Sequence, residues 1–194
     1  MTLRAKWWAV GLAVCAAAAA WADGGFDRFQ AQIGVDDGAR GRAGEAIFRI
    51  ELDGQEVFKS DVLLPGQPPV AVDVPLGAAR ELSLFVDDEG DGHGGDWGNW
   101  LDARLVNSQT GAVLFLTDLV PEERRTWIPS NRDRNIIKEK LSVNDRVYLR
   151  GWGCISGSHM AFSGWEEAAA RAEAAVDELN AAAATAVGSL TLQC

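Results

Sequence analysis

The chain has 194 residues, and 28 Asp and Glu against 18 Lys and Arg give it a formal net charge of −10 at pH 7. A protein this acidic repels nucleic-acid phosphates and anionic lipid surfaces, so neither is an expected partner, whereas neutral ligands and cations are. The length fits one domain of ordinary size.

The N-terminal segment has the three parts of an export signal. Arg4 and Lys6 are basic, residues 7–20 are apolar, and residues 20–22 form a small-residue cleavage motif. The apolar run is shorter than the about 20 residues that a membrane-spanning helix needs. We therefore predict a signal peptide over residues 1–22, a secreted or periplasmic protein, and no membrane contact after cleavage. Cleavage before Cys15 with lipid attachment is the alternative, which the bulky preceding residue disfavours.

Residues 26–116 are predicted to form antiparallel β-strands. Apolar and polar residues alternate there, and turn residues interrupt the alternation about every ten positions. The clearest unit is residues 48–53, which end in Asp53-Gly54, a pair that favours the tight turn of a hairpin. Further strand-like stretches lie at residues 57–58, 70–75, 82–86, 101–106 and 113–116.

The C-terminal part of the chain changes character. Residues 120–140 are charged and rich in turn residues, so we interpret them as a connection. Residues 141–149 are again strand-like. Residues 163–187 are rich in Ala and Glu and begin with a capping-box pattern, which predicts one helix with a weakly packing alanine face. Residues 188–194 then form a tail.

Two cysteines, Cys154 and Cys194, remain after signal cleavage. Under oxidising conditions an even pair of cysteines can form one disulfide, which would tie the C-terminus to the body of the domain. Two unpaired thiols are the alternative, because the sequence contains no information on the distance between them. Neither cysteine belongs to a CxxC motif or another metal-binding spacing.

Four segments of the chain, taken together, resemble one family. They are Phe26–Gly38, Phe48–Gly54 with Val57–Ser60, Ala79–Leu84 and Asp96–Leu105, and they carry the patterns F-x-A-x-x-G-V-D-D, D-G-x-x-V-F-x-S and D-W-x-x-W-x-D-A-R-L. In this order they resemble the NPCBM family, carbohydrate-binding modules that are often attached to glycoside hydrolases.

This resemblance has implications for fold and partners. It implies an all-β, antiparallel jelly-roll sandwich of the galactose-binding-like kind over residues 23–162, with the best match at residues 26–105. It also implies carbohydrate as the ligand, galactose-type glycans in particular, and a glycoside hydrolase acting nearby as a partner.

The family's usual opening is out of place in this chain. Members usually begin with a strand pair of the form L-x-x-N-G-x-x-Y-x-x-G-L-G-x-H-A-x-S, and residues 141–158 are similar to it, with Ile155 at the position of the histidine. In one account the domain is circularly permuted, and residues 141–162 pair with strands of the N-terminal half. In the other, a second, truncated module begins at Leu141. We favour the permutation, because a sandwich without these strands would expose an unpaired edge and apolar core.

No cofactor is established by the sequence, but two groups of acidic residues are candidate ligands for a structural calcium ion. Asp87, Asp88 and Asp91 lie in a glycine-rich loop, and the resemblance allows Asp36 and Asp37 to join a second site. Calcium takes six to eight oxygen ligands, which carboxylates and loop carbonyls supply. The spacing does not match the EF-hand loop, and a solvated acidic loop without metal is the alternative.

The end of the same loop is the candidate sugar-binding site. Trp97 offers an aromatic face for a pyranose ring, and Asp96, Asn99 and His93 offer polar groups that can distinguish hydroxyl orientations. Packing is the alternative role for Trp97. Trp100 is assigned to the core, because it lies on one face of the following strand. Tyr148 and Trp152 are interpreted first as packing residues.

Catalytic patterns are weak in this sequence. A glycosidase needs two carboxyl groups held across the scissile bond, and acids alone do not establish such a pair. The chain has two histidines and lacks a Ser-His-Asp pattern, an HExxH motif and a nucleophile elbow. We therefore expect binding without catalysis. A structural or protein-interaction sandwich is the second hypothesis, and a small glycosidase is the third.

Overall fold

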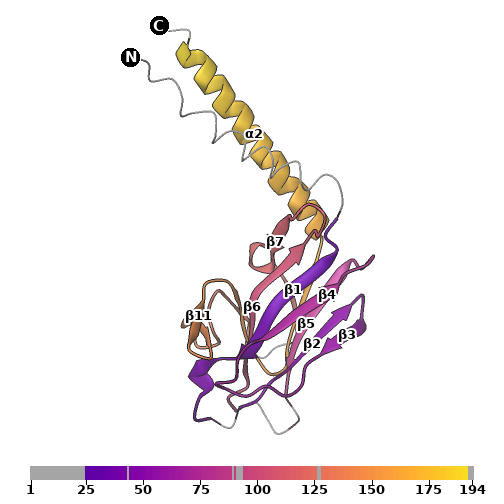
Figure 1. Ribbon diagram of the computed structural model, residues 1–194, viewed down its shortest axis with the longest axis vertical. Coiled ribbons are helices and arrows are strands. Elements are labelled where there is room, and N and C mark those ends of the chain that lie inside the picture. Colours follow the sequence, from indigo (N-terminus) through magenta and orange to yellow (C-terminus); the bar gives the residue numbers. More distant parts are fainter. Residues whose placement is uncertain (1–24, 43, 89, 91–93, 126–127, 192–194) are drawn as a thin grey trace.

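The computed structural model describes residues 25–42, 44–88, 90, 94–125 and 128–191. They form two antiparallel β-sheets packed face to face, with a helix that leaves the sandwich at one end (Figure 1). The predicted all-β, antiparallel sandwich with a C-terminal helix is therefore confirmed. None of the helices in these ranges is long and apolar enough to cross a membrane. The signal-peptide prediction for residues 1–22 falls outside the described residues.

The six-stranded sheet has the order β4-β1-β6-β12-β9, and β7 also pairs with β6. The five-stranded sheet has the order β3-β2-β5-β13-β8. Strands β8 and β9 lie in the segment that was expected to be a connection. The strands of the first sheet are β1 (Arg28–Val35), β4 (Val70–Pro75), β6 (Trp97–Val106), β7 (Val113–Phe115), β9 (Asn131–Arg132) and β12 (Gly151–Ile155). Those of the second are β2 (Ile47–Leu52), β3 (Gln55–Lys59), β5 (Glu81–Asp87), β8 (Glu122–Arg125) and β13 (Ser158–Ser163).

The remaining elements of the described residues are short or lie outside the two large sheets. Strands β10 (Leu141–Val143) and β11 (Arg146–Tyr148) pair only with each other. Two short 3-10 helices, η1 (Asp37–Ala39) and η2 (Leu116–Asp118), follow β1 and β7. The helix that leaves the sandwich is α2 (Trp165–Thr191).

The β2–β3 hairpin shows how the local sequence builds a sheet. Asp53 and Gly54 have φ angles of 48° and 77°, the left-handed conformation that the tight turn needs. Phe48 and Ile50 are fully buried in the core, while Arg49 between them faces outward and is partly exposed. The predicted hairpin is therefore confirmed by the pairing of β2 with β3.

Trp100 of β6 lies in the core between the two sheets and is fully buried. Its ring meets Phe48 of β2 edge-on, with 5.2 Å between centroids, and Phe29 of β1 at 6.1 Å. Because β6 and β2 belong to different sheets, these aromatic contacts join the two layers. The assignment of Trp100 to the core is confirmed, and Trp152 and Tyr148 are buried as packing residues too.

The C-terminal strands complete both sheets. β12 pairs with β6 and β13 pairs with β5, so residues 151–163 supply one strand to each sheet. The predicted pairing with the N-terminal half is confirmed for these residues. For Leu141–Tyr148 it is wrong, because Asn144 and Asp145 adopt positive φ angles of 51° and 63° and fold this segment back on itself.

The β10–β11 hairpin packs against the outer face of the six-stranded sheet. Leu141, Val143 and Tyr148 form a small apolar cluster with Leu101 of β6, separate from the main core. Gly34 of β1 permits this close approach, since a Cβ atom there would lie 2.6 Å from Val143 Cγ1. The segment therefore covers the sheet instead of extending it.

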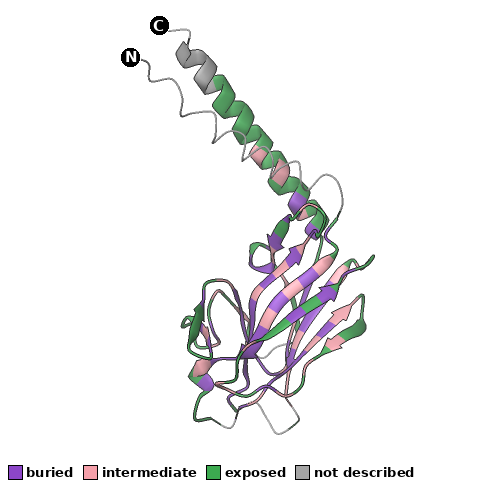
Figure 2. Cartoon of the chain, viewed as in Figure 1, coloured by how far each residue is buried: buried purple, intermediate pink, exposed green. Residues whose placement is uncertain are grey.

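Helix α2 begins later and ends later than the predicted range of 163–187. Its start is delayed because Ser163 still pairs with Glu81 as the last residue of β13. Trp165 and Ala169 are buried with the core, whereas most other described side chains of α2, Leu179 among them, are exposed (Figure 2). The helix therefore stands out from the sandwich as an arm (Figure 1).

Two truncations test whether the C-terminal strands belong to the same folding unit. A chain that ends after Lys140 loses β12 and β13, so β6 and β5 would each expose an unpaired edge. We expect this chain to lose cooperative thermal unfolding in circular dichroism. A chain that ends after Ala170 keeps both strands, Trp165 and Ala169, and we expect it to unfold cooperatively. Cooperative unfolding of the shorter chain would contradict the prediction.

Candidate functional site

A buried carboxylate at the end of β1 organises the region where the sequence predicted calcium. Asp36 is 1% exposed, and its Oδ1 accepts hydrogen bonds from Gly38 N at 2.9 Å and Asn135 Nδ2 at 3.0 Å. Its Oδ2 accepts from Asn99 Nδ2 at 2.7 Å and Ser142 N at 3.2 Å. Four N–H donors thus surround the carboxylate, and donors repel the cation that calcium binding would require. Asp36 is a structural residue.

The other predicted calcium ligands are held apart by partners of their own. Asp37 pairs with Arg40 at 2.8 Å, and Asp87 pairs with Arg49 at 2.5 Å. Asp88 accepts a hydrogen bond from Gly90 N, and Asp91 falls outside the described residues. No cluster of three or more His, Cys, Asp or Glu side chains able to hold a metal ion is found in the described part of the chain. The predicted ligands that the structure describes are therefore not gathered into a metal site.

The predicted sugar-binding residues at the start of β6 are also mostly structural. Asp96 is 1% exposed and accepts hydrogen bonds from Glu45 N at 2.9 Å and Ser156 Oγ at 3.1 Å. Asn99 is fully buried against Asp36. The prediction is wrong for these two residues, because Asp96 accepts hydrogen bonds from groups inside the protein and Asn99 donates one to the buried Asp36 carboxylate.

Trp97 packs instead of presenting a free ring. The side chain is 8% exposed, and the Arg42 guanidinium lies over the ring, 4.7 Å from its centroid. Gly38 sits so close that a Cβ atom there would lie 3.0 Å from the indole. Packing, the alternative for Trp97, is what the structure shows. His93 lies outside the described residues.

Cys154 lies fully buried on β12, with its Sγ 3.6 Å from Ser130 Oγ. Burial raises the pKa of this thiol to about 12, so it stays protonated and unreactive at neutral pH. Cys194 lies outside the described residues, and the pairing of the two cysteines stays a prediction.

A polar groove of about 210 Å³ lies on the outer face of the six-stranded sheet, over β4, β1 and β6. Strand register places Asp73, Gln30, Arg104 and Phe115 in one row across four strands. Arg104 Nη2 donates to Gln30 Oε1 at 3.1 Å, and Gln30 Nε2 donates to an Asp73 carboxylate oxygen at 3.3 Å. Asp73, Gln30 and Arg104 of this row form one part of the groove lining, and they carry both donors and acceptors.

The other polar part of the lining is formed by Gln32 and Asp102, and the apolar part by Ala31, Ala71 and Val72. Tyr148 of the β10–β11 hairpin donates its hydroxyl to Gln32 Oε1 at 3.0 Å, so the hairpin borders the groove. Side-chain amides, a guanidinium and carboxylates are the planar groups that can read the hydroxyls of a small polar ligand. The groove is therefore the candidate binding site.

Sequence reasoning did not single out these groove residues. Gln30 and Gln32 alternate with the core residues Phe29 and Ile33 on β1, so the sequence pattern predicts that their side chains point outward. Their neighbours on β4 and β6 depend on strand register, which the sequence does not display.

A larger hollow of about 490 Å³ lies where α2 leaves the sandwich, beside Arg80, Trp165, Glu166 and Glu167. Its lining contains one hydroxyl, from Ser163, and no side-chain amide. It therefore offers fewer groups that both donate and accept than the groove does, and a weaker match to a ligand rich in hydroxyls.

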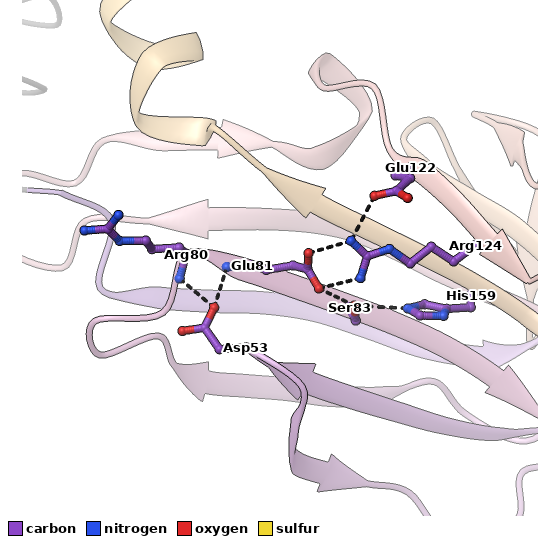
Figure 3. Close-up of polar contacts among 7 residues, drawn as sticks. All are labelled: Asp53, Arg80, Glu81, Ser83, Glu122, Arg124 and His159. Atoms are coloured by element: carbon purple, nitrogen blue, oxygen red, sulfur yellow. Dashed lines mark hydrogen bonds and ion pairs between the residues drawn. The ribbon is translucent and has the colours of Figure 1, made fainter.

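The outer face of the five-stranded sheet carries a charged network (Figure 3). Glu81 of β5 binds the Arg124 guanidinium of β8 through two hydrogen bonds of 2.6 and 2.7 Å, and Glu122 binds it at 2.8 Å. His159 Nε2 lies 3.1 Å from Ser83 Oγ. A Ser-His-acid triad needs the acid on the other histidine nitrogen, whereas Glu81 lies near Ser83 and Arg124. These contacts join β5 to β8 and do not form a catalytic triad.

Phe85 is the aromatic ring of this second face, and its surroundings leave it no free side for a sugar. His159 stacks on the ring with centroids 4.0 Å apart, and the Arg49 guanidinium lies 4.4 Å from its centroid. In the sheet, Arg49 and His159 are the cross-strand partners of Phe85 on opposite sides. Both flanks of the ring are therefore occupied.

Comparison with known families gives the group to which this sandwich belongs. The NPCBM/NEW2 domain matches residues 1–106, which is more than half of the chain. The chain belongs to the NPCBM family. The match ends at the last residue of β6, so the strands β12 and β13 that complete the two sheets of this NPCBM domain lie beyond it.

Two known proteins are similar to parts of the NPCBM chain. A protein of Renibacterium salmoninarum named endo-alpha-N-acetylgalactosaminidase is 32% identical over 88 residues, which cover 45% of this chain and 6% of that protein. A solved structure from Clostridium perfringens, the M60 catalytic domain of ZmpB with its CBM51-1 and CBM51-2 domains, is 18% identical. That alignment covers 70% of this chain and 23% of the other, with a TM-score of 0.33.

Replacing Asp36 tests its structural role in the NPCBM domain. Asp36→Ala would leave the amides of Asn99 and Asn135 and the backbone N–H groups of Gly38 and Ser142 without their acceptor. We expect the free energy of unfolding to fall by about 3 kcal/mol or more, because each buried unpaired donor costs about 1–3 kcal/mol. Urea unfolding measures it. The exposed Asp61→Asn is the control, and a loss as small as that of the control would contradict the prediction.

The pH dependence of stability tests the environment of His159. Burial, with help from the Arg124 charge, lowers the pKa of His159 below its usual value. The unfolded chain then binds the proton more readily, so this residue's stabilising contribution is present above about pH 6.5 and is lost as the pH falls through the folded-state pKa. We expect urea midpoints of the native protein to fall below about pH 6.5 more than those of His159→Gln. Identical pH profiles would contradict this.

Proposed function

We propose that this NPCBM domain is a non-catalytic carbohydrate-binding module that recognises neutral, galactose-type glycans. Membership of the family carries the proposal, since the match spans residues 1–106. The name of the Renibacterium salmoninarum relative supports the ligand class, because N-acetylgalactosamine is a galactose-type sugar. The chain aligns with 6% of that long protein, so the relative's enzymatic activity is not carried over.

The polar groove supports this function by its size and chemistry. Its volume of about 210 Å³ is below the about 300–1,000 Å³ of pockets that enclose drug-sized ligands, and it suits a single sugar ring or the end of a chain. Gln30, Gln32 and Arg104 supply donors, and Asp73 and Asp102 supply acceptors. Hydroxyls, which both donate and accept, match such a mixed lining.

The charges in the groove support binding over hydrolysis. A glycosidase needs one carboxylic acid that carries a proton to the leaving group and a second carboxylate across the bond. Of the two groove carboxylates, Asp73 is already paired with the Arg28 guanidinium at 2.6 Å. Among the described residues this leaves Asp102 as the one groove carboxylate without a charged partner, and a single carboxyl group does not make the pair that hydrolysis needs. The proposed module therefore concentrates its ligand instead of cleaving it.

Export and a nearby enzyme belong to the same proposal. The signal pattern over residues 1–22 supports a secreted or periplasmic location, where free glycans and glycan-coated surfaces are found. A glycoside hydrolase is the partner that a module of this kind would serve, by holding the enzyme's substrate nearby.

A groove-filling variant tests the proposal. Ala71 is exposed on β4 and lines the groove, so Ala71→Trp would occupy the space without disturbing the core. We expect the native protein to bind galactose-type glycans on an array and in calorimetry, and Ala71→Trp to weaken binding by about tenfold or more. Ala170→Trp, on the exposed arm, is the matched control and should bind like the native protein.

Three outcomes would count against the proposal. Absence of binding to any neutral glycan, with and without calcium, would favour the protein-interaction hypothesis. Equal binding by Ala71→Trp would move the site elsewhere. Turnover of an aryl glycoside by the native protein would show catalysis.

A further inference from the structure

Asp102 has a backbone conformation that is unusual for its place in a strand. It lies within β6 and has a φ angle of +49°. In the pairing of β1 with β6, Gln30 faces Arg104 and Gln32 faces Leu101, so two residues of β6 oppose one of β1. This is a β-bulge, which bends a strand and re-aims a side chain. Glycine adopts positive φ without strain, so an aspartate at this position needs another reason.

The other aspartates with positive φ each have such a reason. Asp53 accepts hydrogen bonds from Arg80 N and Glu81 N, as Figure 3 shows, and Asp133 accepts one from Gly151 N. Asp145 pairs with the Arg40 guanidinium at 2.9 Å. Asp102, by contrast, has no side-chain hydrogen bond or ion pair among the described residues, and it lines the groove. Its carboxylate is not used by the fold.

Two side chains beside Asp102, Gln32 and Arg104, each keep one hydrogen-bond donor without a partner in the described part of the chain. The Tyr148 hydroxyl donates to Gln32 Oε1, and the Gln32 Nε2 amide group, which has no partner among the described residues, stays free to donate. Arg104 binds Gln30 through Nε and Nη2, which leaves Nη1 free. The groove therefore combines one unpaired acceptor, the Asp102 carboxylate, with two unpaired donors, Gln32 Nε2 and Arg104 Nη1. Hydrogen bonds to Tyr148 and Gln30 hold the two donor side chains in place.

We propose that Asp102 is the ligand-reading residue of the groove and that it accepts hydrogen bonds from two adjacent hydroxyls of a neutral sugar ring. This rests on the proposed function and adds to it the site and the ligand's chemistry. A carboxylate has two oxygens that can take a pair of neighbouring O–H donors, while Gln32 and Arg104 donate to the sugar oxygens. With Asp73 and Asp102 both in the groove of a protein of net charge −10, acidic sugars are repelled.

The bulge makes the test sharp, because stability and binding should respond differently. Asp102→Gly removes the carboxylate and suits the positive φ, so we expect a melting temperature at or above the native value together with a loss of glycan affinity of about tenfold or more. Asp102→Asn keeps the shape and tolerates the left-handed conformation, and it should lose affinity as well. Lys138→Gly, at a φ of +67° away from the groove, should keep native affinity.

Calorimetry on the mature protein with a neutral galactose-type oligosaccharide, and with its sialylated form, separates this inference from the function beneath it. If the native protein binds, Ala71→Trp does not, and Asp102→Gly binds as tightly as the native protein, the groove is the site and the role of Asp102 is wrong. Equal affinity for the sialylated form overturns the preference for neutral sugars. If the native protein binds no glycan, both the function and this inference fall.

Discussion

The Asp36 carboxylate is the interaction on which the arrangement of the domain depends. It sits at the end of the first strand of the sandwich and gathers N–H donors from β6, from the segment that follows β9, and from the β10–β11 hairpin. A buried charge without partners would be strongly destabilising, so the native state must bring these segments together. The hairpin is thereby held on the outer face of the six-stranded sheet, where Tyr148 fixes Gln32 and borders the groove.

Much of the sandwich could be predicted from the sequence because its strands have one buried and one outer face. β2 and β4 show the alternation plainly, and Asp53-Gly54 marks the hairpin turn. β12 is different, since all five of its residues are buried and it has no alternation. Loop backbone presses on its other face, where a Cβ atom on Gly153 would lie 2.3 Å from Arg134 O. Family resemblance, not periodicity, pointed to this strand.

The site was harder to predict because residue chemistry does not indicate which way a polar group points. Asp96 and Asn99 have the side chains of a sugar-binding site, yet each makes its hydrogen bonds inside the protein, to Glu45 N and to the Asp36 carboxylate. The groove residues come from strands that are distant in sequence and meet only through register and a bulge at Asp102. Asp102 shares its positive φ with Asp53 and Asp133, and it differs from them in having no hydrogen-bond partner for its carboxylate among the described residues, which the sequence does not show.

The arm formed by α2 has a mechanical consequence. A helix of 27 residues is about 40 Å long, and only its first turns are seated on the sandwich. Its alanine-rich composition favours the helical state even without tertiary packing, so the arm behaves as a semi-rigid spacer and not as a flexible linker. Anything joined to its far end would therefore be held at a nearly constant distance from the sandwich, and its motion would change its direction much more than its distance from the groove.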